Sequence, residues 1–593
     1  MVKFFEEISM RHTLKLLKIS ITLVCCLASS TIAGSVEQVQ RMLNQLGYSA
    51  GPVDGAYGRK TKSALDNFYS DNEMVFDGDL SKNEAIDLKK SIISKIHQNF
   101  GNQKVKGSVT TFGNYISPEN KIDTPRGFHY YLPSDLFTKK LQSERSQVFW
   151  ANHFAWGNFS GNKRPELVVS WELHQTCRGK FKDSGHGTWY CEDMDQESSA
   201  QAFPFAVFGI EKSRRVNLAD KFIGQTRVMP YNCNRQLVAD FNEDDLDDIY
   251  CPSTVQGKKG GKFWFGGPDL VYISDGKGRW IRTAEAGEMV DKKYGTYNGF
   301  SHGSTAADID NDGDIDVITP HIKWENTKGG GKIYCHVNDG KGNFNVRHCA
   351  DQFAFSVTTG DYDGDGNVDL MASGGWHQSP AYAHSNSKKH QQTPILFGDG
   401  KGNFGKKRKW KYLEAAYDIY GSNFLFTSLI GPVSWDFDGD GDVDIAGTSI
   451  GPLYVGGTHT IWENDGKGNF TVADQVPLVP SPKKFSNRTI FKQEVKMETN
   501  QWNSYCGRSV LIDLNEDGLM DVICDNVPQD RHNGWFFLNE GGLYFRKISP
   551  FEAWKNGWVQ YYTSVNGAPE QEFSGYSDPD FFQTHWVYKA DYN

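Results

Sequence analysis

Hydrophobic and polar residues follow three different patterns along the 593-residue chain. A mainly apolar stretch without charged residues covers residues 19–32 and follows a basic segment. Apolar positions at helical spacing come next, over about residues 36–98, and Gly-rich turns between them predict three helices. From about residue 150 onward, short apolar runs alternate with Asp- and Gly-rich turns, which predicts many short strands. The chain is therefore expected to be mainly β, with a small helical domain before the strands.

The apolar stretch near the N-terminus has the features of a secretory signal peptide. Arg11, Lys15 and Lys18 precede it, and it ends in the small residues around Ala33. We expect cleavage of residues 1–33, whether the chain starts at Met1 or at Met10, and no integral membrane segment afterwards. An uncleaved anchor is the alternative, but the stretch is short for a membrane span. The mature protein is expected in the periplasm, the cell wall or the extracellular space.

The cysteines support an exported protein. Without Cys25 and Cys26, eight of the ten remain, and they fall in pairs separated by 14, 18, 14 and 18 residues. This spacing predicts four local disulfides, as expected in an oxidising compartment. Zinc is the alternative, but the chain has no CxxC pattern. The predicted pairs are Cys177–Cys191, Cys233–Cys251, Cys335–Cys349 and Cys506–Cys524.

Residues 34–100 form the predicted helical domain. The run VQRMLNQLGYSAGPVDGAYGRKTKSALDNF resembles the peptidoglycan-binding type 1 module, which implies non-catalytic binding to cell-wall glycan or peptide. Its glycines and Asp54 are expected mainly to shape turns. Tyr57, Arg59 and Lys60 are the better candidates for contact with a ligand.

The rest of the chain contains two repeated motifs. The first is Asp-rich, as in ADIDNDGDIDVI (307–318), and occurs five times, with a degenerate sixth copy at 157–168. The second is a turn of the type NDGKGNF, which follows each Asp-rich copy. Successive Asp-rich copies start 53 to 77 residues apart. Repeats of this length with four strands per unit are typical of propeller blades.

Each Asp-rich motif places acidic or amide side chains at positions one, three, five and nine of a sharp turn. Oxygen ligands in such an arrangement suit Ca²⁺, and we expect about four or five structural ions. An EF-hand is excluded because the motif lacks a Glu at position twelve and has strands as flanks. The degenerate copy, with Lys163 in the Gly position, is expected to hold no metal. The predicted ligands are Asp240, Asn242, Asp244 and Asp248; Asp308, Asp310, Asp312 and Asp316; Asp361, Asp363, Asp365 and Asp369; Asp436, Asp438, Asp440 and Asp444; and Asp513, Asn515, Asp517 and Asp521.

These repeats resemble the FG-GAP/VCBS family, the propeller type of integrin α-chain heads. The resemblance implies a calcium-binding β-propeller over residues 101–593, with seven blades favoured and six possible. The seventh blade would combine residues 105–149 with 551–593.

Both motifs are expected on one face of the propeller, and the long, variable connections on the other. Variable loops on a rigid scaffold commonly carry binding residues. The connections contain aromatic, His and Lys residues, among them Lys258, Lys259, Trp264 and His459. The candidates chosen for ligand binding are Trp324, Trp376, His377, Tyr382 and His384.

Charge and motif searches limit the possible functions. The formal net charge is -10, which argues against nucleic acid as a partner. The five intact Asp-rich motifs hold 24 of the 73 acidic residues, so the acidity mainly reflects the predicted metal sites. No GxSxG, HExxH or P-loop motif is present, and Lys258-Lys259-Gly260-Gly261-Lys262 lacks the P-loop ending. We expect a wall-tethered protein that binds a protein or glycan, for instance in adhesion. The alternatives are a wall-tethered carbohydrate-active enzyme, such as a polysaccharide lyase, and a structural envelope protein.

Overall fold

The structure is a computed structural model of the whole chain. It describes residues 36–92 except 82, residues 147–561 with gaps, and residues 586–588. The predicted signal peptide lies outside the described residues, as do residues 93–146. The chain divides into two compact units, an N-terminal one and a larger one. No helix in the described part of the chain is long and apolar enough to cross a membrane.

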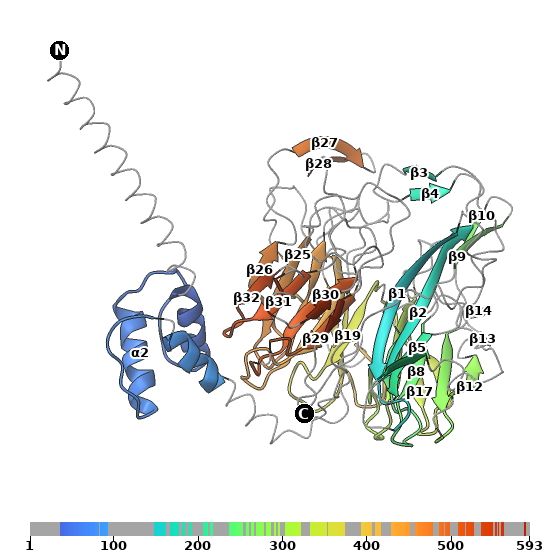
Figure 1. Cartoon of the computed structure of the whole chain (residues 1–593), viewed down its shortest axis with the longest axis horizontal. Helices are drawn as coiled ribbons and strands as arrows, with labels where there is room; N and C mark the ends of the chain where they lie inside the picture. Colours follow the sequence, from blue (N-terminus) through green and yellow to red (C-terminus); the bar gives the residue numbers. More distant parts are fainter. Residues whose placement is uncertain are drawn as a thin grey trace, which may run out of the picture. The chain divides into compact units, whose positions relative to one another are not determined.

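The N-terminal unit contains the three predicted helices (Figure 1). They cover residues 36–45, Arg59–Asp71 (α2) and 83–92. Gly47, just after the first helix, has a φ of 92°, a left-handed conformation that favours glycine. Of the positions predicted from helical spacing to face the core, Leu46 is only half-buried and the others are buried: Val36, Val39, Leu43, Thr61, Ala64, Leu65 and Phe68. Leu88 and Ile92 of the third helix are buried as well. The spacing therefore identified both the helices and their core.

The described residues of the larger unit form six four-stranded sheets, numbered here in chain order. Within each sheet, strands that are neighbours in the sheet pair antiparallel. Sheet 1 consists of β1 (Gln147–Gly157), β2 (Glu166–Thr176), β5 (Ala206–Glu211) and β6 (Arg214–Asn217). Sheet 2 consists of β7 (Leu237–Ala239), β8 (Asp248–Cys251), β11 (Leu270–Ser274) and β12 (Trp280–Glu285). Sheet 3 consists of β15 (Thr305–Ala307), β16 (Asp316–His321), β17 (Lys332–Asn338) and β18 (Phe344–Ala350). Sheet 4 consists of β19 (Val357–Gly360), β20 (Asp369–Ala372), β21 (Pro394–Leu396) and β22 (Lys411–Tyr412). Sheet 5 consists of β23 (Ser428–Trp435), β24 (Asp444–Ile450), β25 (Gly457–Asn464) and β26 (Phe470–Pro477). Sheet 6 consists of β29 (Arg508–Ile512), β30 (Asp521–Asn526), β31 (Trp535–Asn539) and β32 (Phe545–Ile548).

Five further strand pairs lie outside these sheets. Four are hairpins inserted either between the second and third strands of a sheet or between one sheet and the next. They are β3 (Phe181–Asp183) with β4 (Trp189–Cys191), β9 (Gln256–Lys259) with β10 (Lys262–Phe265), β13 (Val290–Asp291) with β14 (Gly295–Thr296), and β27 (Phe485–Ile490) with β28 (Gln493–Glu498). The fifth pair is β33 (Val559–Tyr561) with β34 (Trp586–Tyr588). Most of the predicted seventh blade lies outside the described residues.

The two ends of the sheets differ in what they carry. In an antiparallel meander, the connections after the first and third strands leave at one end, and all others leave at the opposite end. The Asp-rich loops and the NDGKGNF turns therefore share one end, and the four inserted hairpins leave from the other. Figure 1 shows β3–β4 and β27–β28 beyond the same end of the sheets. This arrangement fits the expected division into a repetitive face and a variable face.

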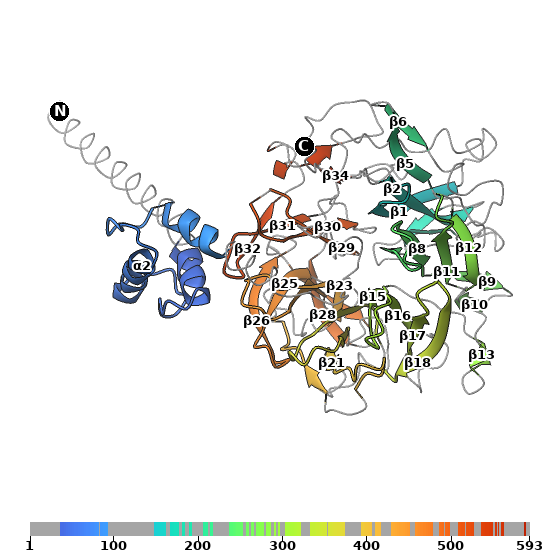
Figure 2. The same ribbon diagram turned by 90° about the horizontal axis from the view of Figure 1, so that it is seen from below.

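Successive sheets pack against each other. The first strand of one sheet contacts the first strand of the next in four pairs: β1 and β7, β15 and β19, β19 and β23, and β23 and β29. In Figure 2, β23 and β29 lie nearer the centre of the set of sheets than β26 and β32 do. Buried hydroxyls join the first strands, with Thr305 Oγ1 3.3 Å from Thr359 Oγ1 and Thr358 Oγ1 3.0 Å from Ser434 Oγ. Apolar cores fill the spaces between sheets 2 and 3, 3 and 4, and 4 and 5.

The NDGKGNF turn fastens its sheet to the preceding one. In sheet 3, Asn338 Nδ2 donates to the carbonyl of Phe241 in the Asp-rich loop of sheet 2, at 2.8 Å. Phe344 packs edge-on against the Phe241 ring, with centroids 5.4 Å apart. Gly342 has a φ of 74°, which favours glycine, and a Cβ there would lie 2.7 Å from Ile273 Cδ1, so a larger residue would force Ile273 to shift.

The same contacts recur between sheets 4 and 5. Asn464 Nδ2 donates to the carbonyl of Tyr362 at 2.9 Å, and Phe470 packs edge-on against the Tyr362 ring. A Cβ on Gly468 would lie 2.8 Å from Phe397. Each turn thus serves as an interface between sheets as well as a reversal of the chain, which explains why both motifs recur together.

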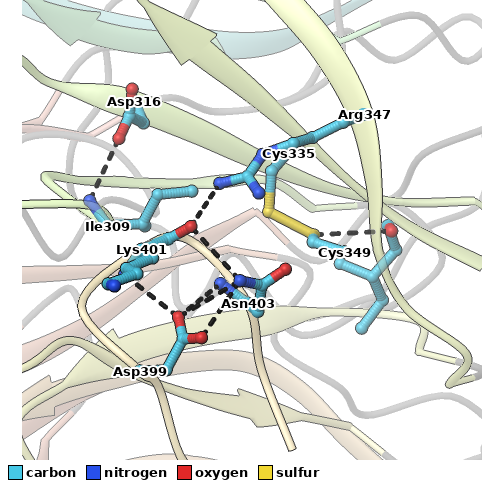
Figure 3. The surroundings of a disulfide bond; sticks show 9 residues. Ile309, Asp316, Cys335, Arg347, Cys349, Asp399, Lys401 and Asn403 are labelled. Carbon is cyan, nitrogen blue, oxygen red and sulfur yellow. Dashed lines mark hydrogen bonds between the residues drawn. A yellow bond between two sulfur atoms is a disulfide. The ribbon is translucent and has the colours of Figure 1, made fainter. Parts of the chain in front are cut away.

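One of the four predicted disulfides is confirmed within the described residues. Cys335 on β17 is bonded to Cys349 on β18, across the hairpin closed by the NDGKGNF turn (Figure 3). Between them, Arg347 donates to the carbonyl of Lys401 in sheet 4, at 2.8 Å. Cys251 is also disulfide-bonded, and its predicted partner Cys233 lies outside the described residues. The pairs of Cys177 and Cys506 involve residues that the structure does not describe.

Two buried histidines give the larger unit a predictable sensitivity to acid. His336 is 0% exposed and His459 is 1% exposed, and burial lowers the pKa of each to about 3. Below a pH of about 6.5, which is the pKa of histidine in the unfolded chain, these histidines bind protons in the unfolded chain but not in the folded chain. The two histidines therefore contribute a loss of stability as the pH drops from about 6.5 towards 3, of about 1.4 kcal/mol per pH unit for each. Buried carboxylates with a raised pKa, such as Asp369, contribute with the opposite sign, so the histidine effect is measured by comparing a variant with the parent protein.

The test uses a His459→Phe variant, because the His459 ring already stacks on Phe537 with centroids 4.0 Å apart. Thermal unfolding at constant calcium should show a smaller loss of Tm between pH 7.5 and 5 in this variant than in the parent protein. Equal losses would contradict the assignment.

Candidate functional site

In the N-terminal unit, Gln40 holds the turn around Asp54 and Gly55 through hydrogen bonds. Its Nε2 donates to Asp54 Oδ1 at 3.0 Å and to Thr61 Oγ1 at 3.1 Å. Its Oε1 accepts the backbone N–H groups of Asp54 and Gly55, at 3.1 and 3.0 Å. Gln40 is only 2% exposed, and its hydrogen bond lowers the pKa of Asp54. Asp54 and Gly55 thus serve the turn itself, whereas Gln40 was not singled out from the sequence.

The three candidate ligand residues of this unit lie on its surface beside the start of α2. Tyr57 is 37% exposed and its hydroxyl donates to the carbonyl of Gly78 at 3.2 Å. Arg59 and Lys60 are exposed in the first turn of α2, which contains no acidic residue. They add positive charge to a helix end that already carries a partial positive charge. Burial and the nearby charges of Asp66 and Asp79 raise the pKa of Tyr57, so this surface carries both signs of charge. The ligand role of the three residues stays a prediction.

The Asp-rich loops of the larger unit share one framework, which begins with the carboxylate at position one. In sheet 3, Asp308 accepts the backbone N–H groups of Asp312 at 3.2 Å and Gly313 at 3.1 Å. The same pair of bonds recurs at Asp240, Asp361 and Asp513. Position six has positive φ, 104° at Gly313 and 66° at Asp245. Asp245 therefore preserves the turn in sheet 2, although it replaces the usual glycine.

The carboxylate at position nine ties the loop to the sheet. Asp316 is 0% exposed, and its two oxygens accept the N–H groups of Ile309 at 3.0 Å and Asn338 at 2.7 Å. Figure 3 shows the Ile309 bond. Burial raises the pKa of Asp316 to about 7, although these two N–H donors oppose the rise. Each carboxylate oxygen has a second lone pair, so bonds of this kind leave room for a cation. Asp248, Asp369 and Asp521 make the equivalent pairs of bonds.

The side chain at position three of the Asp-rich loops gives the strongest indication of a cation site. Asp310 Oδ1 is buried and has no hydrogen-bond partner among the described residues. Burial and the nearby charges of Asp312 and Asp308 raise the pKa of Asp310. In sheets 2 and 6, Asn242 and Asn515 occupy this position, and each also has a buried Oδ1 without a hydrogen-bond partner. Buried polar atoms normally have partners, so the repeated exception needs an explanation.

Three loops bring carboxylate oxygens close enough to share one cation. In each, one oxygen from each of three residues lies within 4.8 Å of the others. The sets are Asp308, Asp310 and Asp316; Asp361, Asp363 and Asp365; and Asp436, Asp438 and Asp444. All of these residues belong to the predicted ligand sets. Their donors are all oxygens, which fits a hard cation such as Ca²⁺ or Mg²⁺ rather than zinc.

The degenerate loop of sheet 1 keeps the framework but not the acidic set. Glu166 takes position nine, and its Oε2 accepts the N–H groups of Phe159 at 3.0 Å and Ser160 at 3.3 Å. Asn158 and Ser160 stand at positions one and three. The position-two bond therefore persists without carboxylates at positions one, three and five, whereas the second bond goes to Ser160 within the loop rather than to the third strand.

The predicted ligand residues of the variable face are not described. Trp324, Trp376, His377, Tyr382 and His384 all lie outside the described residues. His459, which its place in a variable connection assigned to the same face, is instead buried on β25 against Phe537. That assignment was wrong, because β25 extends through residues predicted to form a loop.

Comparison with known proteins agrees for the N-terminal unit. The family model described as "Putative peptidoglycan binding domain" matches residues 33–83, which confirms the module and points to association with the cell wall. This model does not extend to the repeats, and no curated protein matches the chain.

Among solved structures, the chain is similar to three rhamnogalacturonan lyases. The exotype enzyme YesX is 13% identical, covering 64% of this chain and 70% of the enzyme, with a TM-score of 0.25. The enzyme PL11 of Bacillus licheniformis is 12% identical, covering 65% and 71%, with a TM-score of 0.28. YesW is 12% identical, covering 68% and 72%, with a TM-score of 0.28. Likenesses this weak carry no argument about activity.

Proposed function

We propose that the larger unit is a β-propeller of the FG-GAP/VCBS type whose Asp-rich loops hold structural Ca²⁺. The six meander sheets, whose first strands are neighbours in four of the five successive pairs, support the propeller. The buried, unpartnered oxygens at position three support the cation, and the all-oxygen donor sets favour calcium. The Asp-rich loops of sheets 2 to 6 carry the full set of ligand residues, so four or five ions are expected. A bound ion would supply charge neutralisation in each loop and no chemistry of its own.

We further propose that the protein is an exported, cell-envelope binding protein. The matched module tethers it to peptidoglycan, and the calcium-stabilised propeller binds a protein or glycan through its variable face. The observation that carries the tether is the family match over residues 33–83. An enzyme acting on glycans would use the same variable face, so turnover of a bound glycan would favour that alternative.

Sedimentation with insoluble peptidoglycan tests the tether. The full mature chain should pellet with the glycan, and the combined change Tyr57→Ala, Arg59→Gln and Lys60→Gln should reduce the bound fraction by about tenfold. Lys90→Gln is a control for the loss of a surface charge elsewhere in the unit, because Lys90 is 70% exposed on the third helix. A chain that stays in the supernatant, or one that still pellets after deletion of residues 34–100, would refute the tether.

A further inference from the structure

The Asp-rich loops of sheets 2 to 6 differ in the residue at position three. In sheets 3, 4 and 5 it is an aspartate, and in sheets 2 and 6 it is an asparagine: Asp310, Asp363, Asp438, Asn242 and Asn515. With positions one, five and nine, the loops of sheets 3 to 5 offer four carboxylates, and those of sheets 2 and 6 offer three. Among the described residues, sets of three carboxylate oxygens within 4.8 Å of one another occur in the loops of sheets 3, 4 and 5. Sequence and geometry therefore divide the loops in the same way.

The asparagine at position three binds a neighbouring ligand residue of its own loop. In sheet 6, Asn515 Nδ2 donates to Asp517 Oδ2 at 2.7 Å. In sheet 2, Asn242 Nδ2 donates to Asp244 Oδ2 at 3.3 Å and to the carbonyl of Ser274 at 3.1 Å. The amide thus bonds to the position-five carboxylate that a cation would also bind. Its buried Oδ1, which has no hydrogen-bond partner among the described residues of either loop, is the remaining ligand atom.

An aspartate at position three has the opposite effect on the empty loop. In sheet 3, the charges of Asp312 and Asp308 act on Asp310, and an ionised carboxylate has no proton to donate to either of them. Like charges this close repel each other, and a divalent cation removes the repulsion. The calcium affinity of oxygen-ligand loops depends on the number of charged ligands. The loops of sheets 3 to 5 therefore gain more from a bound cation than the loops of sheets 2 and 6 do.

We propose that the Asp-rich loops form two classes of calcium site, with tight sites in sheets 3, 4 and 5 and weaker sites in sheets 2 and 6. This inference rests on the proposed calcium-binding role of the loops and concerns the regulation of those sites. Sheets 2 and 6 stand at the two ends of the run of five sheets that carry acidic loops. A fall in calcium therefore empties the two end sheets first, while the three central sheets stay filled.

Calorimetric titration of the calcium-free full mature chain with Ca²⁺ tests the two classes. It should find three tightly bound ions and two ions bound at least about tenfold more weakly. The double change Asn242→Asp and Asn515→Asp should raise the number of tight ions from three to five. Asp310→Asn, which keeps an oxygen at position three but removes its charge, should lower that number to two.

Two matched controls change the same charges outside the predicted ligand sets. Asn345→Asp adds a carboxylate at an exposed position of β18, in the same sheet as Asp310. Asp314→Asn removes a carboxylate from the loop of sheet 3 itself. Both controls should keep three tight ions, because neither residue is a predicted ligand.

Hydrogen exchange gives a second measurement at a calcium concentration between the two affinities. Backbone amides of β8 and β30, which follow the loops of sheets 2 and 6, should exchange faster than in saturating calcium. Those of β16, β20 and β24, which follow the other three loops, should exchange at an unchanged rate.

Several results would overturn the two classes. They are ions of equal affinity, an unchanged number of tight ions in the double Asn→Asp variant, an equal gain in Asn345→Asp, and equal changes in exchange across all five sheets. A chain that binds no calcium would instead refute the structural calcium sites as a whole. Failure of this inference is therefore distinguishable from failure of the proposed function.

Discussion

Removal of calcium should lower the Tm of the larger unit by about 10 °C. A cation bound at one hundred times its Kd stabilises the folded state by about 2.7 kcal/mol per site. Three loops already bring three carboxylates together, and two more have the ligand residues. In a unit of this size each kcal/mol changes the Tm by only about 1–2 °C, so several sites are needed for the full effect. The measurement is thermal unfolding in excess calcium and in EGTA.

A pair of variants in one loop separates calcium binding from general loss of charge. Asp310→Ala removes the carboxylate with the buried, unpartnered oxygen. It should therefore reduce the calcium-dependent part of the Tm, which is the difference between the Tm in excess calcium and the Tm in EGTA. Asp314→Ala removes the same charge four residues later, outside the predicted ligand set, and should preserve that part. Calorimetric titration should find one ion fewer per chain in the first variant only. An unchanged Tm in EGTA, or equal effects of the two variants, would rule out structural calcium in this loop.

The sequence predicted the parts of the fold that local patterns determine. Helical spacing identified the core positions Val39, Leu65 and Phe68, because an isolated three-helix unit must bury its periodic apolar face. Cys335 and Cys349 were paired correctly because they lie symmetrically about one hairpin turn. These predictions depended only on residues close together in the chain.

Contacts between distant segments could not be predicted in the same way. Asn338 bonds to the carbonyl of Phe241, 97 residues earlier, and the sequence gives no sign that the two segments meet. The Asn before the DGKG turn of sheets 3 and 5 was visible, but its role in joining sheets was not. His459 was misplaced for a related reason, since its burial depends on Phe537 in the next sheet. The variable connections have no repeated register, so pattern analysis does not constrain their structure.

The carboxylate at position nine should matter for stability even without calcium. Replacing Asp316 by Ala leaves the buried N–H groups of Ile309 and Asn338 without an acceptor. Each unsatisfied buried group costs about 1–3 kcal/mol, so the free energy of unfolding should fall by about 3 kcal/mol in EGTA. In calcium the loss should be larger, because Asp316 also belongs to the proposed cation site. Additional loss in calcium would show that Asp316 also binds the ion.

Glu166 provides the decisive comparison, because its loop lacks the acidic set but keeps the position-nine bonds to Phe159 and Ser160. Glu166→Ala should destabilise the unit by a similar amount, and the loss should be the same with and without calcium. Urea unfolding at pH 7.5, with and without EGTA, measures both variants beside Asp310→Ala. If Asp316→Ala is harmless in EGTA, or if the effect of Glu166→Ala depends on calcium, the structural role of position nine is wrong. If both variants behave as expected, each loop has two separable parts: a carboxylate that connects it to the sheet in all six copies, and a cation site that only the acidic copies possess.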